Sequence, residues 1–428
     1  MKTLAAFVSA IALAAPVAAQ TQEAGCIPFT TALSMAAAFS PDAQVELAQR
    51  DEALARLDEL RAFAWPQVSL FGRSLAGDAD LADVRMANQV GVRLTQDVFD
   101  FSKRQLREEA AQYDLQSARL LVEASRDITA LEAGSAYLDA LRAHEQKAAL
   151  AEELTFLGIL ASALQELSAK GEATADETLE ANARLAAMQA QISQLTLMET
   201  QAILTARLLT GLATFSPCSS PNLDGELAVS HARLAASEGA LQQAIMDHPR
   251  VRAAMHAVSA RSADASFEKR AWLPTLRGVG TYAYGQDNGL SDWRDRSSFG
   301  LEFSMPIFSG GGQTAREGAA SARARQAQKT KNVAALEIEQ DLRRAVQAFE
   351  LGRVQLDTRR SAADYKRDQL KLLRQAYEER ARTLRELVEV QSEYTTNELS
   401  AIASRYEFLS TGLKLYVLSG DSRTRQGR

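Results

Sequence analysis

Two long stretches of this chain contain no proline: residues 67–216, between Pro66 and Pro217, and residues 307–428, after Pro306. Proline costs about 3 kcal/mol inside a helix, so its absence over such lengths favours long helices. A single helix over residues 101–169 would extend on the order of 100 Å, at about 1.5 Å per residue. That is far longer than a compact domain, so the chain is predicted to fold with helices lying along helices.

The first of these stretches also has the spacing of a helix-packing seam. Leu121, Ile128, Leu131 and Leu138 follow one another at intervals of seven and three residues, as in helices that run alongside each other. Alanine, glutamate, glutamine and arginine dominate these segments, which allows close packing inside and charge outside. By themselves, the helices predict a spectrin-like rod.

Short segments with a period of two occur ahead of each predicted long helix. Phe299, Leu301, Phe303 and Met305 alternate with small or polar residues, which is typical of a strand with one apolar and one polar face. Residues 89–95 alternate in the same way. Partner strands are predicted at 67–75 and 275–284, with polar loops at 76–87 and 287–296. The chain therefore offers four strands.

The order of helix, strand, loop, strand, long helix, turn and long helix occurs twice, which indicates an internal duplication. Matching landmarks lie 208 or 209 residues apart: Ser40-Pro41 and His248-Pro249, Trp65-Pro66 and Leu273-Pro274, Val98-Phe99 and Ile307-Phe308, Thr174 and Thr383. The predicted divisions are a signal peptide at 1–19, a first repeat at 20–216, an inter-repeat equatorial segment at 217–235, a second repeat at 236–420 and a C-terminal tail at 421–428.

The first 19 residues have the composition of a secretory signal. Lys2 is their only charged residue, an apolar stretch follows, and Val17-Ala18-Ala19 predicts cleavage before Gln20. Beyond this segment, we expect no apolar run long enough for a transmembrane helix. Without Lys2 the formal charge changes from −6 to −7 (−6 minus +1). No basic block is interleaved with aromatic residues, so nucleic acid is not an expected partner.

Cys26 and Cys218 are the only two cysteines, in a chain predicted to reach an oxidising compartment. A disulfide and two buried thiols are both compatible with the sequence, and we predict that the two residues bond to each other. The four histidines show no metal-ligand spacing, and the glycines at 310–312 lack the lysine of a phosphate-binding loop. We therefore expect neither enzyme activity nor a metal or cofactor.

The alternating strands fit either a soluble sandwich or a membrane barrel, in which the apolar face turns outward to lipid. Four strands are too few to close a barrel, whose minimum is about eight. They are also too few to bury a sandwich core beneath two such hairpins. Several chains must therefore combine, and three would supply twelve strands. The alternative is a soluble periplasmic coiled-coil scaffold without pore activity, in which the strands form a small dimerisation module.

Three passages resemble the TolC family of outer-membrane factors: Ala64-Trp65-Pro66, Trp272-Leu273-Pro274 and residues 303–311. The resemblance covers nearly the whole mature chain. It implies a homotrimer in outer-membrane lipid, with a twelve-stranded transmembrane β-barrel continuous with a long periplasmic α-helical barrel. It also implies an exit duct for a tripartite efflux or type I secretion system, with a periplasmic adaptor (a membrane fusion protein) and an inner-membrane transporter of ABC or RND type. Departures are Asp97 in place of Pro306, and Asp100-Phe101-Ser102 in place of the glycines.

The same resemblance implies roles for the two helix–helix turns. Gly171 supplies the positive φ of the first turn, whereas Arg380 stands where glycine is usual in the second. Adaptor-docking tips are expected at Lys170, Gly171, Glu172, Ala173, Thr174, Arg380, Ala381 and Thr383. A periplasmic gate is expected from Asp176, Glu177, Tyr377, Arg382, Glu386 and Glu389. In that gate Tyr377 and Arg382 would reach Asp176 and Glu177 on the neighbouring hairpin, and Glu386 with Glu389 would form an acidic ring that favours cations.

Overall fold

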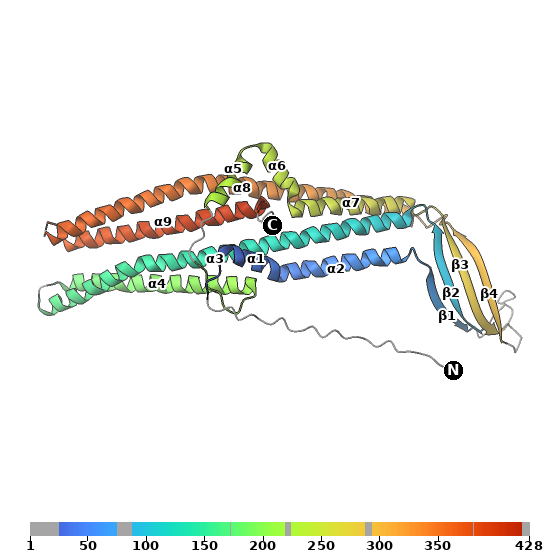
Figure 1. The fold of residues 1–428 in the computed structure, drawn as a ribbon, viewed down its shortest axis with the longest axis horizontal. Coiled ribbons are helices and arrows are strands. Elements are labelled where there is room, and N and C mark those ends of the chain that lie inside the picture. The colour runs from blue at the N-terminus through green and yellow to red at the C-terminus, as the bar shows by residue number, and fades with distance from the viewer. Residues whose placement is uncertain are drawn as a thin grey trace.

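The computed structural model describes residues 25–74, 88–171, 173–218, 224–286, 293–379 and 381–421. Within them the molecule is a long helical assembly with a small sheet at one end (Figure 1). The predicted signal peptide, Leu75, the loop at 76–87, Glu172, Arg380 and the tail beyond 421 lie outside the described residues.

The described elements follow the duplication. They are α1 Phe29–Phe39, α2 Pro41–Ala62, β1 Gln67–Ser74, β2 Asn88–Phe99, α3 Lys103–Ala169, α4 Ala175–Thr210, α5 Asp224–Ala235, α6 Glu238–Asp247, α7 Pro249–Arg270, β3 Thr275–Gln286, β4 Trp293–Ser304, α8 Gly312–Glu378 and α9 Leu384–Leu418. Equivalent helices have equal lengths: α2 and α7 have 22 residues each, and α3 and α8 have 67 each. The predicted mainly helical fold with two long hairpins and four strands is confirmed, whereas the short helices α1, α5 and α6 were not anticipated.

The helices that precede each strand pair begin in the same way. Pro41 and Pro249 occupy the first turns of α2 and α7, where a missing N–H costs nothing. The residue before each proline caps the helix: the Ser40 Oγ accepts from the Ala43 N–H at 3.0 Å, and the His248 Nδ1 accepts from the Arg250 N–H at 3.3 Å. A capping side chain thus stands directly before each proline, so each helix starts at a defined point.

The turn from strand to long helix uses one backbone shape with two different sequences. Gly310 and Gly311 have φ of 60° and 81°, and the equivalent Phe101 and Ser102 have φ of 55° and 63°. Non-glycine residues rarely adopt this left-handed conformation. In the first repeat the Asp100 Oδ2 accepts from the Arg104 backbone N–H at 2.7 Å, which holds the turn together. The missing glycines therefore change the sequence of this turn but not its geometry.

The four strands form one antiparallel sheet in the order β1-β2-β3-β4. β4 begins at Trp293, so residues 293–296, which the sequence predicted as loop, are strand. The correction has a simple cause: Arg294 and Arg296 pair with Gly285 and Ala283, and ladder hydrogen bonds form whatever the polarity of the side chains.

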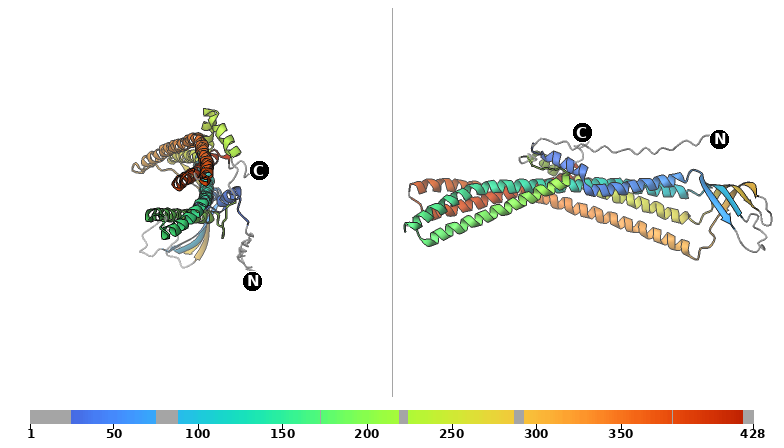
Figure 2. Two further views of the ribbon diagram at one scale, coloured as in Figure 1. Left: turned by 90° about the vertical axis from the view of Figure 1, so that its left-hand side faces the viewer. Right: turned by 90° about the horizontal axis from the view of Figure 1, so that it is seen from below.

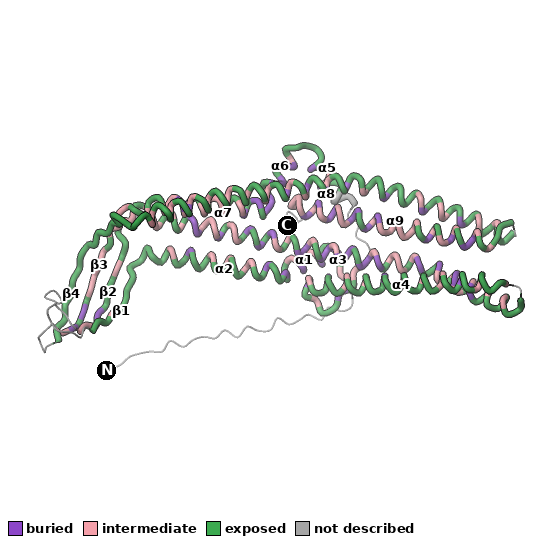
Figure 3. The backbone as a smooth tube through the Cα atoms, turned by 180° about the vertical axis from the view of Figure 1, so that it is seen from behind, coloured by how far each residue is buried: buried purple, intermediate pink, exposed green. Residues whose placement is uncertain are grey.

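The register separates apolar and polar side chains onto opposite faces of the sheet. One face carries Val68, Leu70, Val90, Val92, Leu94, Tyr282, Tyr284, Phe299, Leu301 and Phe303, with Asp295 and Ser297 in the loop-side half of β4. The other face is mainly polar, with Gln67, Ser69, Arg73, Gln89, Arg93, Thr95, Asp97, Arg277, Thr281, Ser298 and Glu302, and it also carries Phe71 and Val279. Phe299 and Leu70 are 81% and 77% exposed. The outer strands β1 and β4 are almost entirely exposed, whereas β3 between its neighbours is largely half-buried (Figure 3). No described part of the chain covers the apolar face.

The hydrophobic core lies where the helices meet in the middle of the molecule. Its largest fully buried side chains include Tyr137 of α3, Leu342 of α8, and Tyr406, Leu413 and Leu415 of α9. Viewed along the long axis, the two hairpins form a curved layer that is open on one side (Figure 2). The chain thus has a central core and two extended ends that bury little.

One helix, α3, contains a stretch apolar enough in composition to cross a membrane, contrary to the expectation from the sequence. α3 packs against α2, α4, α7 and α9, and Leu138, Leu150 and Leu157 on it are buried. Only 22% of the stretch is buried in the single chain, so α3 packs against these helices with part of its apolar surface and leaves the rest exposed.

Cys26 and Cys218 form a disulfide, with their Cα atoms 4.7 Å apart. The segments around them also pair, because the Ile27 N–H donates to the Ser216 carbonyl at 2.8 Å and the Cys218 N–H donates to the Ile27 carbonyl at 3.2 Å. The Tyr137 hydroxyl donates to the same Ile27 carbonyl at 2.9 Å. The bond therefore ties the start of the described chain to the segment between the repeats, over the core.

Removing this disulfide is expected to lower the free energy of unfolding by about 2–4 kcal/mol, because the link closes a long loop in the unfolded chain. The variant Cys26→Ser with Cys218→Ser, and the wild type treated with a reductant, should lose the same amount in denaturant titrations. Equal gel mobility with and without reductant, together with two titratable thiols in the untreated protein, would contradict the prediction.

Candidate functional site

The two helix–helix turns lie together at the end of the molecule opposite the sheet (Figure 1). Gly171 has φ of 77°, as the first turn was predicted to require. Of the predicted docking residues that the structure describes, Lys170, Gly171, Thr174, Ala381 and Thr383 are exposed, and Ala173 is half-buried. These tips are therefore accessible in the single chain.

Each turn leads into its second helix through a capping box. The Glu177 N–H donates to the Thr174 Oγ1 at 3.3 Å, and the Thr174 N–H donates back to the Glu177 Oε2 at 3.0 Å. Thr383 and Glu386 repeat the arrangement at 3.4 and 3.2 Å. The pattern of threonine followed three residues later by glutamate is a known sign of a helix start, and it would have revealed this role from the sequence.

The cap also affects the charge of Glu177. Hydrogen bonds from the backbone N–H and the hydroxyl of Thr174 lower the pKa of the Glu177 carboxyl, and attraction from Arg385 lowers it further. The exposed carboxylate is thus stabilised in its charged form.

Arg382 contacts a residue of its own hairpin. Its Nη1 lies 3.5 Å from the Glu386 Oε1, one turn further along α9. Among the described residues, no hydrogen bond or ion pair joins Tyr377 or Arg382 to Asp176 or Glu177 of the same chain. The predicted link to the neighbouring hairpin is therefore not formed between the described hairpins of one chain. In a trimer each hairpin would also neighbour one of the next chain, and there the link stays a prediction.

Arg385, which the sequence reading did not single out, is the basic residue beside Glu177 across the two hairpins. Both side chains line a cavity of ≈ 90 Å³, together with Leu160, Leu164, Glu180, Ala181, Arg184, Leu384 and Val388. Periodicity could not have found this pair, because it depends on how α4 and α9 approach one another.

The predicted acidic ring is divided by the structure. Glu389 is exposed. Glu386 is half-buried, and its carboxylate accepts the capping hydrogen bond from the Thr383 N–H and pairs with Arg382. Glu389 is therefore the freer of the two carboxylates in one chain. Within the described ranges, no group of three or more histidine, cysteine, aspartate or glutamate residues is arranged to hold a metal ion.

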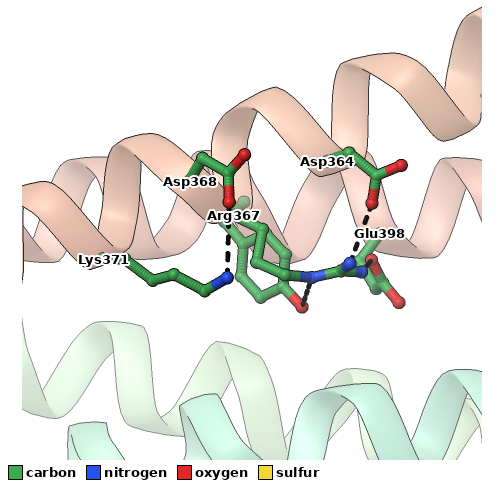
Figure 4. A network of polar contacts seen from close by, with 6 residues as sticks. Asp364, Arg367, Asp368, Lys371 and Glu398 are labelled. Carbon is green, nitrogen blue, oxygen red and sulfur yellow. Dashed lines mark hydrogen bonds and ion pairs between the residues drawn. The ribbon is translucent and has the colours of Figure 1, made fainter.

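Above the tips, polar contacts hold the hairpins in register. Arg367 of α8 donates to Glu398 of α9 at 3.2 Å and to Asp364 at 2.8 Å (Figure 4). Arg374 of α8 donates to Gln391 of α9 and to Glu152 of α3, both at 2.8 Å. Arg374 therefore bridges the two hairpins as well as the two helices of its own.

Comparison with known proteins gives a family match for part of the chain and a shared fold for nearly all of it. Residues 240–421, most of the second repeat, match the sequence model of the family described as outer membrane efflux protein. Among proteins of curated function, none matches the chain at a significant level.

Several solved structures share the fold over almost the whole chain. A membrane protein from Pseudomonas aeruginosa matches with a TM-score of 0.78 and 21% identity, covering 91% of this chain and 90% of its own. The Campylobacter jejuni CmeC outer membrane channel matches with a TM-score of 0.75 and 15% identity, covering 93% and 88%. The open state of the Neisseria gonorrhoeae MtrE outer membrane channel matches with 0.74 and 15%, covering 92% and 88%. The second repeat thus matches the outer membrane efflux protein family, and over almost its whole length the chain has the fold of these outer-membrane channels.

Proposed function

We propose that three copies of this chain form an outer-membrane channel that serves as the exit duct of a tripartite efflux or type I secretion system. The main support for this proposal is the sheet, with its open edges and its uncovered apolar face. In the described residues β1 and β4 each pair on one side only, and one sheet face is apolar and uncovered. Open sheet edges do not occur in lipid, so the sheet needs further strands. Four strands from each of three chains would close a twelve-stranded barrel.

The direction of the faces supports a membrane rather than a soluble core. The strands have 8 to 12 residues, about the length that crosses a bilayer when tilted. On the polar face, the Arg277 Nε donates to the Asp97 Oδ1 at 2.7 Å, and Arg93 stacks over Phe71. Charged residues of this kind suit a water-filled lumen. The apolar face would then contact lipid.

The helices also leave apolar side chains for neighbouring chains. Leu138 of the predicted seam is buried, but Leu121 and Ile128 are 36% and 47% exposed. In a trimer these positions would pack against the next subunit and extend the barrel as a helical tunnel. The capped tips would meet a periplasmic adaptor, which would connect the tunnel to an inner-membrane transporter of ABC or RND type.

Oligomeric state and pore activity test the proposal together. Purified protein is expected to need detergent, to have a trimer mass in light scattering after the detergent is subtracted, and to produce discrete conductance steps in planar bilayers. A monodisperse monomer would refute the barrel. Protein that stays soluble without detergent and shows no conductance would instead favour the soluble coiled-coil scaffold.

A further inference from the structure

A buried carboxylate lies at the seam between the two hairpins. Glu153 of α3 is only 3% exposed, and its Oε2 has no hydrogen-bond partner. It lines a cavity of ≈ 370 Å³ formed by α3, α4 and α9, with Gln146, Leu150, Met188, Gln191, Leu195, Ser392, Thr395, Thr396, Leu399, Ser400 and Ala403. An unsatisfied buried carboxylate is costly, which makes this cavity unusual for a coiled coil.

Several polar side chains around Glu153 have committed donors and free acceptor oxygens. The hydroxyls of Thr396 and Ser400 donate to the Ser392 and Thr396 carbonyls, each at 2.9 Å. The Gln146 Nε2 donates to the Leu399 carbonyl at 3.2 Å. Because these donors are used, the oxygen lone pairs of the same side chains remain available to a ligand.

The charge of Glu153 is not balanced by a direct ion pair with the nearby Arg184, so the cavity could accept a positive group. Arg184 lowers the pKa of Glu153 only as a lesser influence, and its own guanidinium pairs with Glu180 at 2.6 Å. Burial raises the pKa of the Glu153 carboxyl above its ordinary value, and the interaction with Thr395 offsets only part of that shift. Burial therefore disfavours the charged form of Glu153, and a bound cation would favour it.

We propose that this cavity binds an organic ammonium ion with an apolar body. The ammonium would contact the Glu153 Oε2 and the acceptor oxygens, and the apolar part would lie on Leu150, Met188 and Leu195. The volume lies within the range of small-molecule pockets, about 300–1,000 Å³. The site is contained in one chain, so this inference does not depend on pore activity.

Fluorescence titration of the full-length protein in detergent tests the site. The probes are dansylcadaverine, a primary alkylammonium, and dansylglycine, a carboxylate with the same fluorophore. Wild type is expected to bind the cation and not the anion. Glu153→Gln, which keeps the shape of the side chain, should weaken cation binding about tenfold or more. Glu166→Gln, at an exposed site on the same helix, should leave it unchanged.

The unmodified protein provides a second measurement. Binding should weaken as the pH falls through the raised pKa of Glu153, because protonation removes the negative charge that the ammonium needs. Equal affinity of wild type and Glu153→Gln, equal affinity for both probes, or no binding at all to a correctly assembled protein would overturn the proposal.

Stability against pH checks that Glu153→Gln is folded. The raised pKa means that the folded protein holds this proton more tightly than the unfolded chain does. The stability contributed by the neutral acid is therefore present at low pH and is lost as the pH rises through the raised pKa. The glutamine variant cannot ionise there, so it should unfold at the same temperature as wild type or higher at neutral pH, without ligand.

Discussion

Phe299→Arg is expected to prevent stable insertion of the barrel, whereas Ser298→Arg should insert normally. The two residues are neighbours in β4 but point to opposite faces: Phe299 pairs with Gly280 on the apolar face, and Ser298 with Thr281 on the polar face. An arginine that faces lipid near the middle of the bilayer costs about 2–4 kcal/mol. Three copies in a trimer multiply that cost. An arginine facing the lumen remains in water.

Heat-resistant trimers in outer-membrane fractions provide the measurement. The same substitution at adjacent positions controls for β-propensity, size and added charge, so the face is the remaining difference. If both variants insert equally well, or if Ser298→Arg is the defective one, the assignment of the apolar face to lipid is wrong.

Loosening the tips should raise single-channel conductance severalfold in planar bilayers. Arg385→Ser removes the attraction to Glu177 across the two hairpins of one chain. Tyr377→Phe with Arg382→Ser removes the predicted link to Asp176 and Glu177 of the next chain. Each contact lies at an exposed tip and is weak alone. Because a trimer repeats it three times, losing all copies should shift the closed end toward an open state.

Lys371→Ser is a suitable control for both variants, because Lys371 is exposed and pairs at 3.3 Å with Asp368 of its own helix. Comparing Arg385→Ser with the variant Tyr377→Phe, Arg382→Ser distinguishes a contact within one chain from a contact between chains. Unchanged conductance in both, with trimers still inserted, would mean that the tips do not restrict the pore.

Glu389→Gln should leave conductance of the closed form low and weaken cation selectivity. Glu386 is a poor probe of charge, because it also caps α9.

Much of the architecture was determined by local sequence patterns. Two proline-free stretches produce the long hairpins, and residues 89–95 and 299–305 alternate strictly enough to define strands with two chemically different faces. The duplication placed equivalent elements at equivalent positions, including Thr174 and Thr383 at the starts of α4 and α9. These features depend on propensity and period, which act over a few residues and can be read along the chain.

Other features arise only from the folded chain. The start of β4 at Trp293 depends on pairing with β3. The left-handed turn at Phe101 has no glycine, and it is held by the hydrogen bond that the Asp100 carboxylate accepts from the Arg104 N–H. Arg385 meets Glu177, and Glu153 lines a cavity with residues of α4 and α9, because the hairpins pack at one particular rotation. Local patterns specify which face of a helix is apolar, but the partner of each side chain depends on the rotation and offset between helices. Contacts spread over the whole chain set those two quantities, so only the tertiary structure decides them.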